Sequence, residues 1–342
     1  MLETAILRQP SGPLMKKPAS LLILSLSLAI VVAPAAHGQT KRIAAGYSAI
    51  SAVQVGFYIA KDAKLFDKHG LYVDPVYVAG GSRMAQAIVG GEFALALAGG
   101  NIVNVNLAGG DVVVIGGVVN VPSFDLYVPP SIKRSEDLKG KSLGITRFGA
   151  STDVSLRAYL KKYRLEPDRD VNILQMGGQP EIVAGMQAGV VHGGILSSPA
   201  DFNAKRAGFV MIANFAKEGL DFPTTSLVST RSTIKRDRDT VKRFLMAYSE
   251  AVDLLFRDKE VGLKILGKWT RTHDREALES SYEYATNFIE RPPRLPYKAM
   301  ENIVASMAET DPRAKDRKAE EFMDPSVYNE LEKTGFFKSL GR

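Results

Sequence analysis

Two successive runs of short apolar segments that alternate with amphipathic segments constrain the fold of this chain more than any other feature. The first run predicts strands at 43–47, 71–78, 93–98 and 112–116. Between them it predicts helices at 53–63, 83–89 and 102–107, and the first of these continues toward Gly70. Strands that alternate with helices in this way are typical of a mostly parallel sheet that is covered by helices on both faces.

The second run follows a strand at 124–128, which Pro129 and Pro130 end. It predicts strands at 143–146, 171–175, 193–196 and 210–213, with helices at 152–163, 180–188 and 199–206. A further strand at 225–229 precedes helices at 237–257, 259–269, 274–289, 297–309 and 326–334. We therefore expect an α/β fold with two doubly wound lobes joined by two crossover segments. Lobe 1 comprises 39–125 and 220–342 with its helical C-terminal tail, and lobe 2 comprises 126–219.

The first part of the chain has the organisation of a secretory signal peptide. The basic pair Lys16–Lys17 precedes an apolar run at 21–32, and the small residues Ala36 and Gly38 follow it. A transmembrane helix needs about 20 apolar residues, so this run is short for one. A membrane anchor or a buried helix is the alternative interpretation. We expect residues 1–38 to be removed and the mature chain to be periplasmic, without membrane insertion.

Composition and motifs exclude several classes of function. The chain has no cysteine, which excludes disulfides, thiolate metal sites, a cysteine nucleophile and a lipidated cysteine anchor. Lys and Arg exceed Asp and Glu, but acids interrupt the basic clusters, as at 235–239, which indicates solvated surface rather than a nucleic-acid site. The histidines are dispersed, and no HExxH, GxSxG or P-loop motif is present. We expect no enzyme activity, no catalytic residue, no metal, no cofactor and no nucleic-acid partner.

Six turns of small and polar residues stand between a predicted strand and a predicted helix. They lie at 47–51, 79–82, 99–101, 149–152, 177–179 and 197–199. The free N–H groups at the start of a helix, together with the helix dipole, attract anions and polar groups of a ligand. Such residues are also ordinary N-caps and turn formers, and for one turn that explanation suffices. Six turns that face one cleft favour a binding site.

Larger side chains near these turns allow two interpretations each. Arg147 precedes the turn at 149–152, where it either pairs bidentately with an acidic ligand or is simply exposed. Phe57, Tyr58, Phe124 and Phe148 either stack on a ligand or fill the core.

Several linked motifs resemble one family of transport proteins. The segment 136–153, EDLKGKSLGITRFGASTD, resembles the opening of the second lobe in the substrate-binding proteins of nitrate/sulfonate/taurine-type ABC importers, the SsuA/THI5-like or NMT1 group. The segments 54–74, 80–93 and 187–199 are similar to further motifs of that group. The chain departs from it at Phe93 and at His192-Gly193, where many relatives have an aspartate.

The resemblance implies a periplasmic binding protein-like fold of type II that closes on a ligand. Carried over residue by residue, the ligand contacts would be Ser51, Gly81, Ser82, Gly100 and Asn101 from lobe 1, and Gly149, Ser151, Thr152, Gln179 and Ser198 from lobe 2, beside Arg147. The ligand would be a small polar or anionic organic molecule, such as a sulfonate, nitrate, a pyrimidine or a related compound.

The resemblance also implies partners and leaves alternatives open. A periplasmic binding component of an importer acts as a monomer that meets an ABC permease and its ATPase subunits. A ligand-presenting partner of a membrane receptor would share the same sequence features. The thiamine-pyrimidine synthases of the group are enzymes, but they are cytoplasmic and carry a cysteine-rich motif, so the absence of cysteine and the signal segment oppose that interpretation.

Overall fold

The computed structural model describes residues 40–99, 102–219, 221–309 and 311–341. The predicted signal peptide at 1–38 and the predicted ligand contacts Gly100 and Asn101 lie outside the described residues. Within the described ranges, no helix is both long enough and apolar enough to cross a membrane.

The first lobe is built on a five-stranded sheet with the order β2-β1-β3-β10-β4. Its strands are β1 Lys41–Tyr47, β2 Leu71–Tyr77, β3 Leu95–Ala98, β4 Val112–Val119 and β10 Thr225–Thr230. Strand β1 is parallel to β2 and β3, whereas β10 is antiparallel to β3 and β4. Strands β1, β2, β3 and β4 therefore run in the same direction, as predicted, and β10, which enters the sheet from the other lobe, runs opposite to them and makes the sheet mixed.

The second lobe repeats this arrangement in the order β7-β6-β8-β5-β9. Its strands are β5 Asp125–Val128, β6 Ser142–Ile145, β7 Asn172–Gln175, β8 Gly193–Leu196 and β9 Val210–Asn214. Here β6 is parallel to β7 and β8, and β5 is antiparallel to β8 and β9. In each sheet, the antiparallel strand is the first strand after the chain arrives from the other lobe.

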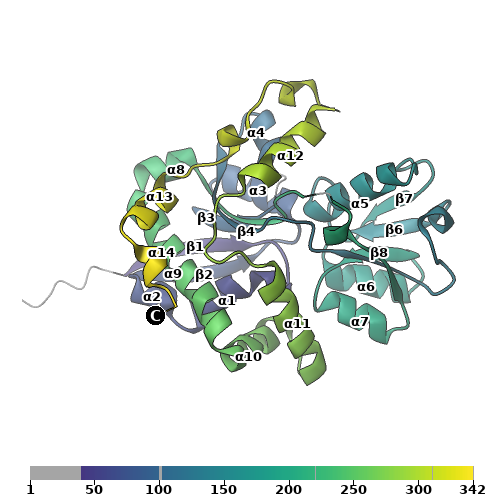
Figure 1. Cartoon of the computed structure of the whole chain (residues 1–342), viewed down its shortest axis with the longest axis horizontal. Helices are drawn as coiled ribbons and strands as arrows, with labels where there is room; N and C mark the ends of the chain where they lie inside the picture. Colours follow the sequence, from purple (N-terminus) through teal and green to yellow (C-terminus); the bar gives the residue numbers. More distant parts are fainter. Residues whose placement is uncertain (1–39, 100–101, 220, 310, 342) are drawn as a thin grey trace, which may run out of the picture. The chain divides into compact units, whose positions relative to one another are not determined.

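Helices cover both faces of each sheet (Figure 1). Around the first sheet lie α1 Val55–Asp62, α2 Leu65–Lys68, α3 Gly81–Val89, α4 Ile102–Leu107, α8 Arg231–Arg236 and α9 Arg238–Arg257. Around the second lie α5 Ser151–Lys162, α6 Gln179–Gln187 and α7 Ala200–Arg206. The C-terminal part adds α10 Lys259–Thr270, α11 Arg275–Phe288, α12 Tyr297–Ala308, α13 Ser326–Lys333 and α14 Phe336–Ser339.

The helix predicted at 53–63 and onward is divided in the structure. A 3₁₀ turn, Ala52–Gln54, precedes α1, and α2 follows after a break at Lys64. Lys64 has a φ of 57°, in the left-handed region that interrupts a helix. Helices α8 and α14 are short and were not predicted, because neither spans enough residues to show a helical period.

The cores lie between each sheet and its helices. Helices α9 and α10 pack on α1, and α13 packs on α9, so this part of the C-terminal tail covers the first lobe. Helix α11 makes further contacts. The Ser281 hydroxyl on α11 lies 2.9 Å from the Ser198 hydroxyl, and Tyr284 donates a hydrogen bond to the Ser123 carbonyl. The tail therefore also contacts the second lobe and a crossover segment.

Candidate functional site

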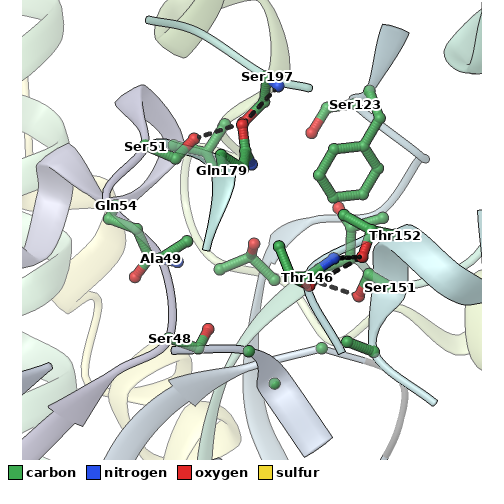
Figure 2. A pocket seen from close by; sticks show the side chains of 18 residues that line it. Ser48, Ala49, Ser51, Gln54, Ser123, Thr146, Ser151, Thr152, Gln179 and Ser197 are labelled. Carbon is green, nitrogen blue, oxygen red and sulfur yellow. Dashed lines mark hydrogen bonds between the residues drawn. The ribbon is translucent and has the colours of Figure 1, made fainter. Parts of the chain in front are cut away.

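A cavity lies between the two sheets where their strands give way to loops (Figure 2). Its volume is about 50 Å³. It is lined by Ser48, Ala49, Ser51, Val53, Gln54, Gly80, Gly81, Gly99, Ser123, Phe124, Thr146, Ala150, Ser151, Thr152, Gln179, Ser197, Thr224 and Thr225. None of these described lining residues is charged, and eleven of them carry a hydroxyl or an amide.

The turn after β1 forms one wall and touches the second lobe. The Ser51 hydroxyl lies 3.0 Å from the Ser197 hydroxyl, and the N–H of Ala52 donates to the Ser198 carbonyl at 2.8 Å. The Tyr58 hydroxyl donates to the Ala49 carbonyl at 3.0 Å, which fixes the turn to α1. These bonds hold the two lobes together along this wall.

The start of α5 forms the opposite wall. The Ser151 hydroxyl donates to the Thr224 carbonyl at 3.2 Å, which is a second link between the lobes. The hydroxyls of Thr146 and Thr152 lie 2.8 Å apart, and the N–H of Thr146 donates to the Thr152 hydroxyl at 3.1 Å. This network fixes the end of β6 against the first turn of α5, so the hydroxyl positions are set before any ligand arrives.

Gln179, the first residue of α6, positions the loop that follows β8. Its Nε2 donates to the Ser197 hydroxyl at 2.8 Å, and its Oε1 accepts from the N–H of Ser197 at 2.7 Å. Gln179 is buried, so both of these bonds are shielded from water. Ser197 thereby links Gln179 of the second lobe to Ser51 of the first lobe on one side of the cavity (Figure 2).

Three helices begin at the cavity wall. Their N-cap residues are Gly80 for α3, Ala150 for α5 and Gly178 for α6, and none of these caps supplies a side-chain hydrogen bond. The first N–H groups of a helix have no partner within it, and they carry the positive end of the helix dipole. Neutral hydroxyls and these N–H groups can together hold a polar or anionic ligand without a charged side chain.

Two acids, the buried Asp125 and the partly buried Asp201, lie close to the residues that line the cavity. Asp125 follows the lining residue Phe124, and its Oδ1 accepts from the Asn214 amide at 2.7 Å. Burial, with the nearby charge of Asp201 as a second cause, raises the pKa of Asp125 to about 6. Burial also raises the pKa of Asp201. Neither acid lines the cavity.

The predicted ligand contacts fall into five groups. Ser51, Gly81, Ser151, Thr152 and Gln179 line the cavity. Ser82 and Gly149 border another hollow, of about 460 Å³, together with Phe148. Ser198 is fully buried and faces Ser281. The Nε of Arg147 donates to the Ala79 carbonyl at 3.4 Å, and Arg147 does not line the cavity. Gly100 and Asn101 are the two outside the described residues.

Several lining residues were not among the predicted contacts. Ser48 and Ser197 belong to turns that the sequence had singled out, and only the choice of residue within the turn was missed. Ser123, Thr224 and Thr225 belong to the two segments that join the lobes. A segment that crosses between two lobes has to border the cleft between them. Polar residues in the predicted crossover segments could therefore have been chosen as candidate ligand contacts.

The sequence model of one protein family, described as NMT1/THI5 like, matches residues 51–260. This chain belongs to the NMT1/THI5-like family. A Brachyspira hyodysenteriae protein, whose name places it among ABC transporter periplasmic binding proteins, is 21% identical over 257 residues, which cover 70% of this chain and 72% of that protein.

Solved structures share the fold. The alkanesulfonate-binding protein SsuA from Xanthomonas axonopodis pv. citri bound to MOPS superposes with a TM-score of 0.69 and 20% identity, covering 82% of this chain and 96% of that one. The periplasmic nitrate-binding protein NrtA from Synechocystis PCC 6803 has a TM-score of 0.66 and 14% identity, covering 86% and 89%. The family's two-lobed periplasmic binding protein-like fold is therefore the fold of this chain.

Proposed function

We propose that this chain is an extracytoplasmic solute-binding protein of an ABC import system of the sulfonate/nitrate type. It captures a small polar or anionic organic molecule in the cavity between its two lobes and delivers the molecule to a membrane permease. The observation that carries this proposal is the cavity itself, which neutral hydroxyls, amides and the starts of α3, α5 and α6 line from both lobes.

The lining defines what kind of molecule fits. A buried polar or ionic group is stable only when hydrogen bonds replace its lost water. The hydroxyls of Ser51, Ser151 and Thr152 can each donate or accept, so they suit the oxygens of a sulfonate or nitrate and also the ring atoms of a pyrimidine. With so small a volume in the closed arrangement, larger ligands require the lobes to separate.

Location and delivery rest on other grounds. The signal-like segment at 1–38 supports export, with Gln39 as the first residue of the mature chain. The N-terminus of the exported chain, read by mass spectrometry, tests that assignment.

The Brachyspira relative supports a partnership with an importer's permease and ATPase. Genes for a permease and an ATPase beside this one would support import, and their absence would favour the receptor-partner alternative.

Thermal unfolding with a compound panel tests binding. A ligand that binds only the folded chain at 100 times its Kd adds about 2.7 kcal/mol to the free energy of unfolding, which raises Tm by about 5 °C in a chain of this size. We expect a rise of that order with at least one of ethanesulfonate, taurine, nitrate, an aminopyrimidine, an aromatic carboxylate or an amine. A panel that leaves Tm unchanged would contradict the proposal.

The variant Ser151→Trp locates the binding. An indole at the start of α5 fills the cavity, so we expect the ligand-induced rise in Tm to disappear while the circular dichroism spectrum is kept. Ser131→Trp is the matched control, because Ser131 is exposed on a turn of the second lobe away from the cavity. Equal ligand responses of the two variants would remove the start of α5 from the site.

A further inference from the structure

Two side chains cross between the lobes beside the cavity but do not line it. Arg147 follows the lining residue Thr146 and reaches the first lobe, where its Nε donates to the Ala79 carbonyl at 3.4 Å. Its aliphatic part lies against Gly80, because a Cβ added to Gly80 would clash with the Arg147 chain and lie 3.0 Å from its Cβ. Gly80 also has a φ of +86°, so glycine is required there for two reasons.

Tyr77 makes the reciprocal contact from the first lobe. It ends β2, and its hydroxyl oxygen lies 2.9 Å from the point where a Cβ on Gly178 would stand. Burial, followed by the negative charge of Glu181 on α6, raises the pKa of Tyr77 to about 12, and the charge of Arg147 acts in the opposite direction. Tyr77 therefore lies within range of the charges of both Glu181 and Arg147.

These contacts lie on the solvent side of the cavity. Tyr77 is 37% exposed, whereas the cavity residues next to the contacts, Thr146 and Gln179, are only 8% and 5% exposed. On both lobes, a residue that makes an outer contact is adjacent in sequence to a lining residue: Ala79 is next to Gly80, Arg147 to Thr146, and Gly178 to Gln179. A molecule leaving on this side has to pass between these groups.

We propose that Arg147 and Tyr77 form a rim latch, which holds the two lobes together outside the cavity and sets how fast a bound molecule leaves. This inference rests on the proposed function for the identity of the site, but the latch itself can be tested without a ligand. Arg147 is in this view a positioning residue that acts on lobe closure and makes no contact with the ligand. Its Nε donates to the Ala79 carbonyl while its aliphatic part lies against Gly80, and the ammonium at the end of a lysine side chain cannot reproduce this geometry.

The absence of cysteine provides a ligand-free test on the full chain. Ser51→Cys with Ser197→Cys replaces two hydroxyls that are 3.0 Å apart across the lobes, so a disulfide forms under mild oxidant only when the lobes meet. We expect Arg147→Ala to slow this cross-linking about 5- to 10-fold in that background, and Arg147→Lys to give an intermediate rate. Tyr77→Phe should slow it about 2-fold.

The control is Arg169→Ala, which removes one positive charge from the exposed surface of the same lobe and should leave the cross-linking rate unchanged. Equal cross-linking rates with and without Arg147→Ala in the double-cysteine variant would overturn the latch. A double-cysteine variant that forms no cross-link would also overturn it. Hydrogen exchange on chains without the added cysteines provides a second measurement. Arg147→Ala should increase exchange at 79–82 and 178–182, and unchanged exchange there would also overturn the proposal.

The release rate connects the latch to binding. The single tryptophan, Trp269, stacks on Tyr58 at 4.5 Å, and Tyr58 binds the cavity residue Ala49, so its fluorescence can follow binding. With ethanesulfonate as the probe, we expect Arg147→Ala to release about 10-fold faster, with the association rate within about 2-fold of wild type. An unchanged release rate contradicts the latch. The chain could bind no compound and still cross-link at a rate that depends on Arg147. This result would support the latch and contradict only the proposed function.

Discussion

At the residue scale, Asp125 is the buried acid whose protonation affects stability most clearly. Asp125 is 9% exposed and accepts a hydrogen bond from Asn214. The negative charge of Asp201 raises the pKa of Asp125 further. Lys205 and Lys217 lower its pKa only in part. Because the folded chain holds this carboxyl protonated up to a pH of about 6, against 3.8 for an ordinary aspartate, the folded state binds the extra proton between these values.

Stability should therefore fall as the pH rises through that window. The stabilising effect of the Asp125 proton is complete below pH 3.8 and is lost as the pH passes about 6. We expect Asp125→Asn to be more stable than wild type by about 2 kcal/mol at pH 7, with the difference vanishing near pH 4. Urea unfolding of both chains at several pH values measures this difference. Asp67→Asn, at an exposed position, is the control, and an equal pH profile for Asp125→Asn and wild type would contradict this prediction.

The residue scale also shows where the sequence stops being informative. Ser197 and Ser198 are adjacent, yet Ser197 faces Gln179 and the cavity while Ser198 faces Ser281 on α11. The sequence identified the turn from its composition. It could not say which hydroxyl faces the cavity, because that is decided by a partner that lies more than 80 residues away for Ser198.

At the element scale, aromatic packing joins the N-terminal helices to the C-terminal tail. Phe244 on α9 stacks on Phe66 of α2 with ring centroids 4.9 Å apart, and it lies 6.3 Å from Phe57 of α1. All three rings are fully buried. This cluster fixes α1, and α1 carries the Tyr58 hydroxyl that holds the cavity turn. The tail thus supports one wall of the cavity at a distance.

Phe244→Ala should lower the free energy of unfolding by about 3–5 kcal/mol, because it leaves a cavity in a packed aromatic core. Chemical denaturation measures the loss. Phe148→Ala is the matched control, since Phe148 is 49% exposed and its removal should cost less than about 1 kcal/mol. Similar losses for both variants would show that the cluster does not carry the packing described for it.

The elements themselves follow from local patterns more readily than their pairing does. Helices such as α4, α7 and α12 begin and end within two residues of their predicted bounds, because apolar spacing and glycines mark them. The insertion of β10 between β3 and β4 could not be predicted, because the residues that pair there are over 100 positions apart along the chain. The position of β5 between β8 and β9 could not be predicted either, because its partners also lie far along the chain, as Asp125 and Asn214 do.

At the scale of the whole molecule, contacts from separate parts of the chain surround the cavity. Ser51 meets Ser197, Ser151 meets the Thr224 carbonyl, and Arg147 meets the Ala79 carbonyl. Helix α11 adds a further link through Ser281. Each is a hydrogen bond that can break without disturbing either sheet, so the lobes can separate as bodies while each core stays intact.

A crystal structure of the mature chain with the compound that raises its Tm most is the direct test of the central claim. We predict that the compound lies in the cavity between the lobes, within hydrogen-bond distance of Ser51, Ser151 or Thr152, with Arg147 on Ala79 outside it. A compound bound elsewhere on the chain, with the cavity unchanged, would contradict the claim that this cavity is the binding site.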